Sequence, residues 1–202
     1  MIAVVVIVAL GDSLTAGYID PLRRMPYTHI LEELIRRELG VEVTIINAGV
    51  PGDTTEGMLR RFEVDVHAHE TDYAIIWGGI NDLHLGRSPQ EVVANLLQLY
   101  RRCKAVAITP IGCTLTPTRF EALNKLVREV NEDLSMRCLD EGVLIADLYS
   151  ILVDRDGLLD PRFSSDGVHL NPAGYRVVAE ALYGVFRSLI YGGLRGRGRE
   201  LI

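Results

Sequence analysis

The 202-residue sequence lacks a long apolar run, since a membrane span would need roughly 18 to 20 consecutive apolar residues. Its apolar opening, residues 2–10, has no basic segment ahead of it and runs directly into Gly11 without a plausible cleavage site. This opening is therefore typical of a strand rather than of a signal peptide. We expect a cytoplasmic protein without a membrane span.

Cysteine is scarce as well. The three cysteines are odd in number and none stands at CxxC spacing, which argues against a disulfide framework and a zinc cluster. His67 and His69 have no third ligand nearby, so we assign them to the surface and expect no metal site. Buried free thiols are expected at Cys103, Cys113 and Cys138.

Positive charge is limited too. The formal net charge is -6, and lysine occurs twice against nineteen arginines. This balance argues against a nucleic-acid surface, because such surfaces concentrate Lys and Arg to meet phosphate. The expected partner is a small molecule. Glutamine occurs only at Gln90 and Gln98, and this shortage of amides suits a thermophilic source, which we state as a hypothesis.

Five short apolar, β-branched runs predict the strands of a buried parallel sheet. They cover residues 3–8, 41–46, 73–77, 105–109 and 143–146. Segments of helical period occupy residues 26–39, 54–62, 89–103, 119–139 and 172–190. Alternating strands and helices predict one three-layer α/β/α domain over residues 1–191, followed by a solvated Gly/Arg-rich tail over residues 192–202.

Polar residues follow these strands at one edge of the expected sheet. Ser13 comes after the first run, Gly52 after the second and Asn81 after the third, while Asp166 and His169 precede the last helix. In an open parallel sheet, ligands bind beyond the carboxyl ends of the strands. We therefore expect these five residues to lie near one another.

Their side chains suit ester hydrolysis through a serine. His169 is the candidate base for Ser13, because an imidazole with a pKa of about 6.5 accepts and returns a proton near neutral pH. Asp166 can accept a hydrogen bond from His169 and stabilise the imidazolium. Gly52, which has no Cβ, lets its N–H approach a ligand, and Asn81 offers a side-chain amide.

Each residue also has a purely structural explanation. Gly-Asp-Ser is common turn chemistry, Asn81 with Asp82 suits a helix cap, and a single His169 is typical of a surface. Order and position favour catalysis, because the segments fall at the predicted edge and none lies elsewhere.

Four of these segments resemble the sequence blocks of the SGNH hydrolase superfamily, also called the GDSL esterases and lipases. They are Gly-Asp-Ser-Leu at 11–14, Asn-Ala-Gly-Val-Pro-Gly at 47–52, Gly-Ile-Asn-Asp at 79–82 and Asp-Gly-Val-His at 166–169. The first, continued by Ala16-Gly17-Tyr18, is similar to the lysophospholipase and thioesterase branch. The resemblance covers nearly the whole chain.

This resemblance implies a set of roles. Ser13 is the implied nucleophile and oxyanion N–H donor, Gly52 and Asn81 are the other oxyanion donors, and Asp166 and His169 complete the triad. It also implies a flavodoxin-like five-stranded sheet of order 2-1-3-4-5 and a mechanism that uses neither metal nor cofactor.

The substrate and the activity itself leave alternatives. The mainly small or apolar segment 111–117 favours an ester with a small or medium acyl chain, and carbohydrate O-deacetylation is the alternative. A catalytically silent flavodoxin-like binding module also stays open, although a Walker motif and a GxGxxG are both missing. A standard α/β hydrolase is disfavoured, because Thr15 stands where GxSxG needs glycine. Oligomeric state is not indicated.

Overall fold

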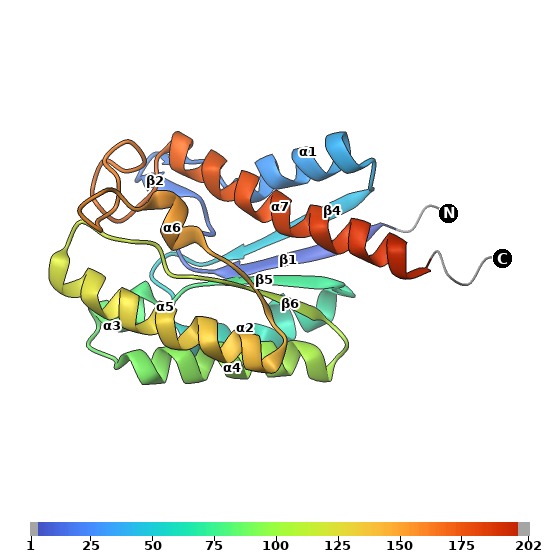
Figure 1. The fold of residues 1–202 in the computed structure, drawn as a ribbon, viewed down its shortest axis with the longest axis horizontal. Coiled ribbons are helices and arrows are strands. Elements are labelled where there is room, and N and C mark those ends of the chain that lie inside the picture. Colours follow the sequence, from blue (N-terminus) through green and yellow to red (C-terminus); the bar gives the residue numbers. More distant parts are fainter. Residues whose placement is uncertain (1–3, 198–202) are drawn as a thin grey trace.

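The computed structural model describes the backbone of residues 4–197. Its centre is a parallel sheet of order β4-β1-β5-β6-β7 with helices on both faces (Figure 1). These strands are β1 (Val5–Gly11), β4 (Val43–Gly49), β5 (Tyr73–Trp77), β6 (Thr109–Cys113) and β7 (Leu144–Ala146). Numbered among themselves they run 2-1-3-4-5, so the predicted three-layer architecture and its strand order are confirmed.

Two apolar clusters join the helices to the sheet. Helices α1 (Tyr27–Leu39), α6 (Leu148–Leu152) and α7 (Pro172–Arg197) cover one face, and α2 (Thr55–Asp65), α4 (Pro89–Ala105) and α5 (Glu121–Glu141) cover the other. Side chains of β1 alternate between the clusters, with Ile7 and Ala9 in one and Val8 and Leu10 in the other. This alternation explains why the strand is apolar throughout.

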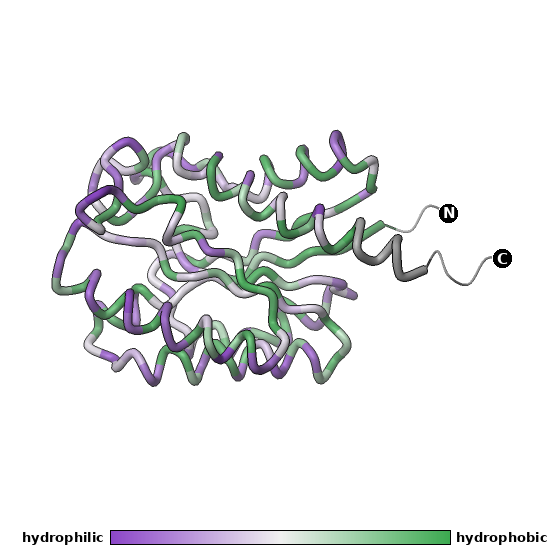
Figure 2. The backbone as a smooth tube through the Cα atoms, in the orientation of Figure 1, coloured by the Kyte–Doolittle hydropathy of each residue, from purple (hydrophilic) through white to green (hydrophobic). Residues whose placement is uncertain are grey.

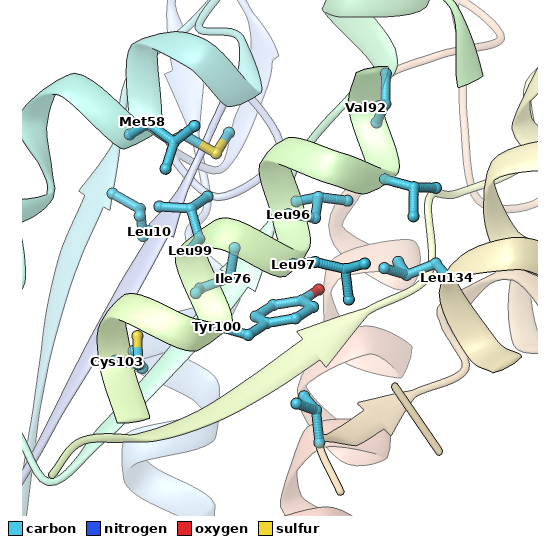
Figure 3. Close-up of a cluster of buried hydrophobic side chains, with 14 of the residues drawn as sticks. Leu10, Met58, Ile76, Val92, Leu96, Leu97, Leu99, Tyr100, Cys103 and Leu134 are labelled. Atoms are coloured by element: carbon cyan, nitrogen blue, oxygen red, sulfur yellow. The ribbon is translucent and has the colours of Figure 1, made fainter. Parts of the chain in front are cut away.

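The cluster under α2, α4 and α5 is mainly aliphatic. Leu96 and Leu99 of α4 belong to it together with Leu10 and Ile76 of the sheet (Figure 3). Burying one leucine contributes roughly 1.5 to 3 kcal/mol. Figure 2 shows the corresponding pattern along the chain, with hydrophobic strands at the centre and alternating hydrophobic and hydrophilic stretches along the outer helices. The three cysteines are free and buried, as predicted.

The fourth strand lies later in the chain than the sequence predicts. The sequence pattern predicts that the run at 105–109 pairs in the sheet, but α4 continues to Ala105 and Ala107 has a φ of 61° in the connection. Strand β6 instead begins at Thr109 and contains Pro110. Proline is tolerated there because β6 pairs with β7 only from Ile111 onward, so no ladder bond on that side needs its missing N–H.

Several connections contain short helices and strands that the spacing of apolar residues in the sequence did not predict. They are the hairpin of β2 (Tyr18–Asp20) and β3 (Arg23–Arg24), the 3-10 helix η1 (His67–His69), helix α3 (Ile80–His84) and helix α6. A helix of five residues is too short to show a period of 3.6. The hairpin and α3 both follow strands at the predicted functional edge.

The last helix is longer than predicted. Helix α7 extends to Arg197 instead of ending near residue 190, so the predicted tail at 192–202 begins as helix, and residues 198–202 lie outside the described range. The sequence pattern did not predict this extension, because the two glycines at 192 and 193 lower the helix propensity there. Within residues 4–197 neither α7 nor any other helix is both long and apolar enough to cross a membrane.

Candidate active site

Ser13 lies directly beyond the carboxyl end of β1, in a tight loop. The amide of Ala16 donates to the carbonyl of Asp12, and the amide of Tyr18 donates to the carbonyl of Ser13, both at 2.9 Å. The Asp12 carboxylate accepts a further bond from the amide of Leu14 at 2.9 Å. These bonds fix the loop, and Ser13 keeps only 7% of its surface exposed.

Asp166 and His169 lie in the turn that precedes α7. One carboxylate oxygen of Asp166 accepts from the amides of Val168 and His169 at 2.9 and 2.8 Å. The turn needs the positive φ of 84° at Gly167, a conformation that glycine adopts without steric cost. The spacing of three residues therefore places the carboxylate beside the imidazole of its own turn.

A chain of polar contacts joins this turn to Ser13. The second oxygen of Asp166 lies 2.7 Å from Nδ1 of His169, and Nε2 of His169 lies 3.1 Å from Oγ of Ser13. The ring of Tyr18 lies against the imidazole, with a centroid separation of 4.6 Å and a tilt of 57°. With Nδ1 donating to Asp166, Nε2 is left to accept the Ser13 proton.

The charge of Asp166 is stabilised by its contacts. Partial burial on its own raises the pKa of this carboxyl, but the backbone bond from Val168 and the contacts with His169 outweigh that effect and lower the pKa below its ordinary value. Asp166 is therefore ionised at neutral pH, as a partner that stabilises an imidazolium must be.

Asn81 lies at the same edge of the sheet, in helix α3, which follows β5. Its Nδ2 donates to the carbonyl of Asp53 at 2.8 Å and lies 3.4 Å from the carboxylate of Asp12. Both it and Ser13 line the cleft described below. Asp53 thus takes one Nδ2 hydrogen, and the other, which has only the longer contact with Asp12, is the one available to a ligand beside Ser13.

Gly52 lies in the turn after β4. Pro51 and Gly52 occupy the centre of this turn, with the amide of Asp53 donating to the carbonyl of Val50 at 3.0 Å and a φ of 80° at Gly52. This pattern is typical of a type II turn, which favours proline followed by glycine. The turn is joined to β1, because the amide of Val50 donates to the carbonyl of Gly11 at 3.0 Å. Gly52 thus lies at the predicted edge but does not line the cleft.

A cleft of about 610 Å³ opens next to Ser13, which we call the Ser13 cleft. Its lining combines the polar groups of the site with apolar side chains from α3 and the start of α5. Its lining consists of Ser13, Ile80, Asn81, Leu83, His84, Phe120, Ala122, Leu123, Leu126, Asp166, Val168 and His169. An apolar wall next to a nucleophile is suited to an aliphatic or aromatic group.

Asp12, beside Ser13, is a buried acid, although its sequence context of Gly-Asp-Ser indicates only a turn. It is 1% exposed, and burial raises the pKa of its carboxyl to about 7, with the nearby charges of Asp53 and Asp82 acting in the same direction. The sequence at this position does not distinguish a buried aspartate from one in an exposed turn.

Within residues 4–197 no cluster of three His, Cys, Asp or Glu side chains could hold a metal ion.

The sequence is similar to known proteins over most of its length. Residues 9–177 match the model of the GDSL-like lipase/acylhydrolase family. An arylesterase of Vibrio mimicus is 34% identical over 93 residues, which is 46% of each chain. Thioesterase 1/protease 1/lysophospholipase L1 of Escherichia coli is 29% identical over 102 residues, half of this chain and 47% of that one. The matches thus span less than half the length of these two curated relatives.

The fold is shared with solved structures. A member of the lipolytic protein G-D-S-L family from Veillonella parvula superposes with a TM-score of 0.77 at 26% identity, over 92% of this chain and 99% of that one. The similarity therefore extends over most of the α/β/α fold.

Proposed function

Because the chain belongs to the GDSL-like lipase/acylhydrolase family, we propose that it is a serine ester hydrolase with Ser13 as nucleophile, His169 as general base and Asp166 as the partner of that base. One observation carries the proposal. The contacts of 2.7 and 3.1 Å join Asp166, His169 and Ser13 in an unbroken chain that ends at the Ser13 cleft. Both distances lie within hydrogen-bond range, as a nucleophile and its base require.

The reaction takes two steps in this geometry. Ser13 Oγ attacks the acyl carbonyl while His169 Nε2 accepts its proton, and the resulting imidazolium is stabilised by the ionised Asp166. The same proton passes to the leaving alcohol as the acyl enzyme forms. Water then attacks the acyl enzyme, giving a proton to His169, and the acid leaves as the proton returns to Ser13.

The oxyanion is stabilised by donors at the carboxyl ends of three strands. They are the N–H of Ser13 after β1, the N–H of Gly52 after β4 and the Nδ2 amide of Asn81 after β5. Each donor is worth about 10² to 10³ in turnover where donors of this kind have been removed. Support comes from the bonds that hold Asn81 and the Gly52 turn in place.

The substrate that this cleft favours is an ester with a small or medium acyl chain. Ile80, Leu83 and Leu126 present apolar surface to the Ser13 cleft, and Phe120 is 55% exposed at its border. Each CH₂ group that leaves water contributes about 0.8 kcal/mol. The names of the relatives, an arylesterase and a thioesterase/lysophospholipase, fit acyl substrates of this kind.

Turnover of p-nitrophenyl butyrate by the wild type and by Ser13→Ala tests the proposal. We expect the substitution to lower kcat by several orders of magnitude and to abolish labelling by a fluorophosphonate, with an unchanged melting temperature. Ser188→Ala, at an exposed serine on α7, is the matched control and keeps full activity. Equal activity of Ser13→Ala and Ser188→Ala would refute the assignment, and an inactive wild type would favour a silent binding module.

A panel of acetyl, butyryl, octanoyl and palmitoyl esters, an acyl-CoA and acetylated xylan identifies the substrate class. We expect butyryl and octanoyl esters to give the highest kcat/KM. A preference for acetylated xylan over every acyl ester would instead assign the chain to carbohydrate O-deacetylation.

A further inference from the structure

One arginine on α2 is unusually enclosed for its residue type. The side chain of Arg61 is 18% exposed and makes four contacts through its guanidinium group. Nε donates to the Asp53 carboxylate at 2.7 Å, Nη1 donates to the Ala48 carbonyl and the Asp65 carboxylate at 2.7 Å each, and Nη2 donates to the Gly11 carbonyl at 2.9 Å. A planar guanidinium fork can serve several acceptors at once, whereas an ammonium group cannot reproduce its geometry.

Three of these acceptors belong to the backbone or side chains that lead into the proposed oxyanion donors. Gly11 ends β1 two residues before Ser13, Ala48 lies near the end of β4, and Asp53 directly follows Gly52. Only the contact with Asp65, four residues further along the helix, lies within α2 itself. A helix-stabilising role would need that contact alone.

Asp53 extends this connection to the third donor. Its side chain accepts from Arg61, while its backbone carbonyl accepts from Nδ2 of Asn81 at 2.8 Å. A shift of Asp53 would therefore move the Gly52 turn and rotate the Asn81 amide together. The pair is also largely enclosed, since the Asp53 side chain is 12% exposed, so it is screened less than a surface pair.

We propose that Arg61 is a positioning residue that, through Asp53, Ala48 and Gly11, sets the spacing of the oxyanion donors of Ser13, Gly52 and Asn81. This proposal rests on the proposed function, because oxyanion donors have a role only if the site hydrolyses esters. Arg61 does not touch the substrate, and its effect is exerted on the transition state through the groups it holds.

The test compares Arg61→Gln and Arg61→Lys with Arg60→Gln. Arg60 neighbours Arg61 on the same helix and forms an exposed ion pair with Glu56, so it controls for charge and helix stability. We expect kcat for p-nitrophenyl butyrate to fall about 10- to 100-fold in Arg61→Gln, with KM within about threefold, because donors displaced by about 1 Å lose transition-state stabilisation. The kcat of Arg61→Lys should lie between those of the wild type and Arg61→Gln. The kcat of Arg60→Gln should stay within about twofold of the wild type.

A tetrahedral adduct separates positioning from a loss of folding. A trifluoromethyl ketone forms such an adduct with the serine, whereas the matched methyl ketone reports ground-state binding. Arg61→Gln should weaken the inhibition by the trifluoromethyl ketone by about the same factor as kcat and leave the methyl ketone unchanged. Asp53→Asn should give the same pattern, and the double variant should be no worse than the single ones.

Other results would overturn the proposal. Equal kcat in Arg61→Gln and Arg60→Gln would do so. A rise in the KM of Arg61→Gln, with inhibition by both ketones weakened equally, would do so as well. If Arg61→Gln does not fold, Arg61→Lys and Asp53→Asn carry the same comparison. Failure of the proposed function is distinguishable, because it appears as full activity in Ser13→Ala, whatever Arg61 does.

Discussion

Replacing the buried Asp12 with asparagine should make the stability of the protein less dependent on pH. Burial raises the pKa of Asp12 in the folded state from 3.8 to about 7. The folded state therefore holds a proton that the unfolded chain releases between these two values. Stability from this group is fully present below 3.8, is lost progressively as the pH rises to about 7, and is constant above that.

The size of the effect follows from the shift. One pH unit of differential proton binding is worth about 1.36 kcal/mol, so moving from 3.8 to about 7 costs the wild type about 4 kcal/mol of stability. Full burial justifies this conversion, because solvent does not screen the group. The side-chain amide of Asp12→Asn cannot ionise. This amide faces Nδ2 of Asn81, which adds a penalty, but that penalty does not depend on pH.

Urea unfolding of both proteins at about pH 4.5 and about pH 8.5 measures the difference. We expect the free energy of unfolding of Asp12→Asn, relative to the wild type, to increase by about 3 kcal/mol between the lower and the higher pH. Asp140→Asn, at an exposed position of α5, is the control, and its difference from the wild type should change by less than about 0.5 kcal/mol. If the difference in free energy of unfolding between Asp12→Asn and the wild type changes as little with pH as it does for Asp140→Asn, the argument from burial of Asp12 is refuted.

Three further substitutions test other parts of the structure. Gly112→Ala places a Cβ 2.6 Å from the Tyr100 hydroxyl, so urea unfolding should show a loss of about 1 to 3 kcal/mol, and a neutral result would contradict the close approach. Asp166→Asn should lower kcat by about 10³- to 10⁴-fold, because the imidazolium of His169 loses its counter-charge, and steady-state kinetics should show KM nearly unchanged. Leu123→Trp should lower the octanoyl-to-acetyl ratio of kcat/KM by filling the Ser13 cleft, and an unchanged ratio would place the acyl chain elsewhere.

Four of the five main strands could be predicted because each contains a short apolar, β-branched run. The third run, 73–77, coincides with β5, and the first, second and fifth end within three residues of the observed strands. The fourth was misplaced because Val106 and Ile108 have β-branched side chains, whereas Pro110 and Gly112 are typical of loops. Packing in the folded protein overrides both the strand preference of the β-branched residues and the loop preference of proline and glycine. Tyr100 occupies the space that Gly112 leaves, and Pro110 precedes the pairing with β7.

The proximity of Ser13 and Asn81 followed from topology, because each comes after a parallel strand and these strands end at the same edge, whereas His169 was placed there by its position just ahead of the last helix. The contacts that position them did not follow. Arg61 and Asp53 are eight residues apart, and the guanidinium reaches Gly11 across fifty positions of sequence. A surface pair of charges has the same sequence pattern as this enclosed pair. Its acceptors exist only once β1, β4 and α2 have assembled, so the spacing of the oxyanion donors depends on packing that no local motif specifies. A substitution that preserves all four sequence blocks, such as Arg61→Gln, should therefore still impair the site.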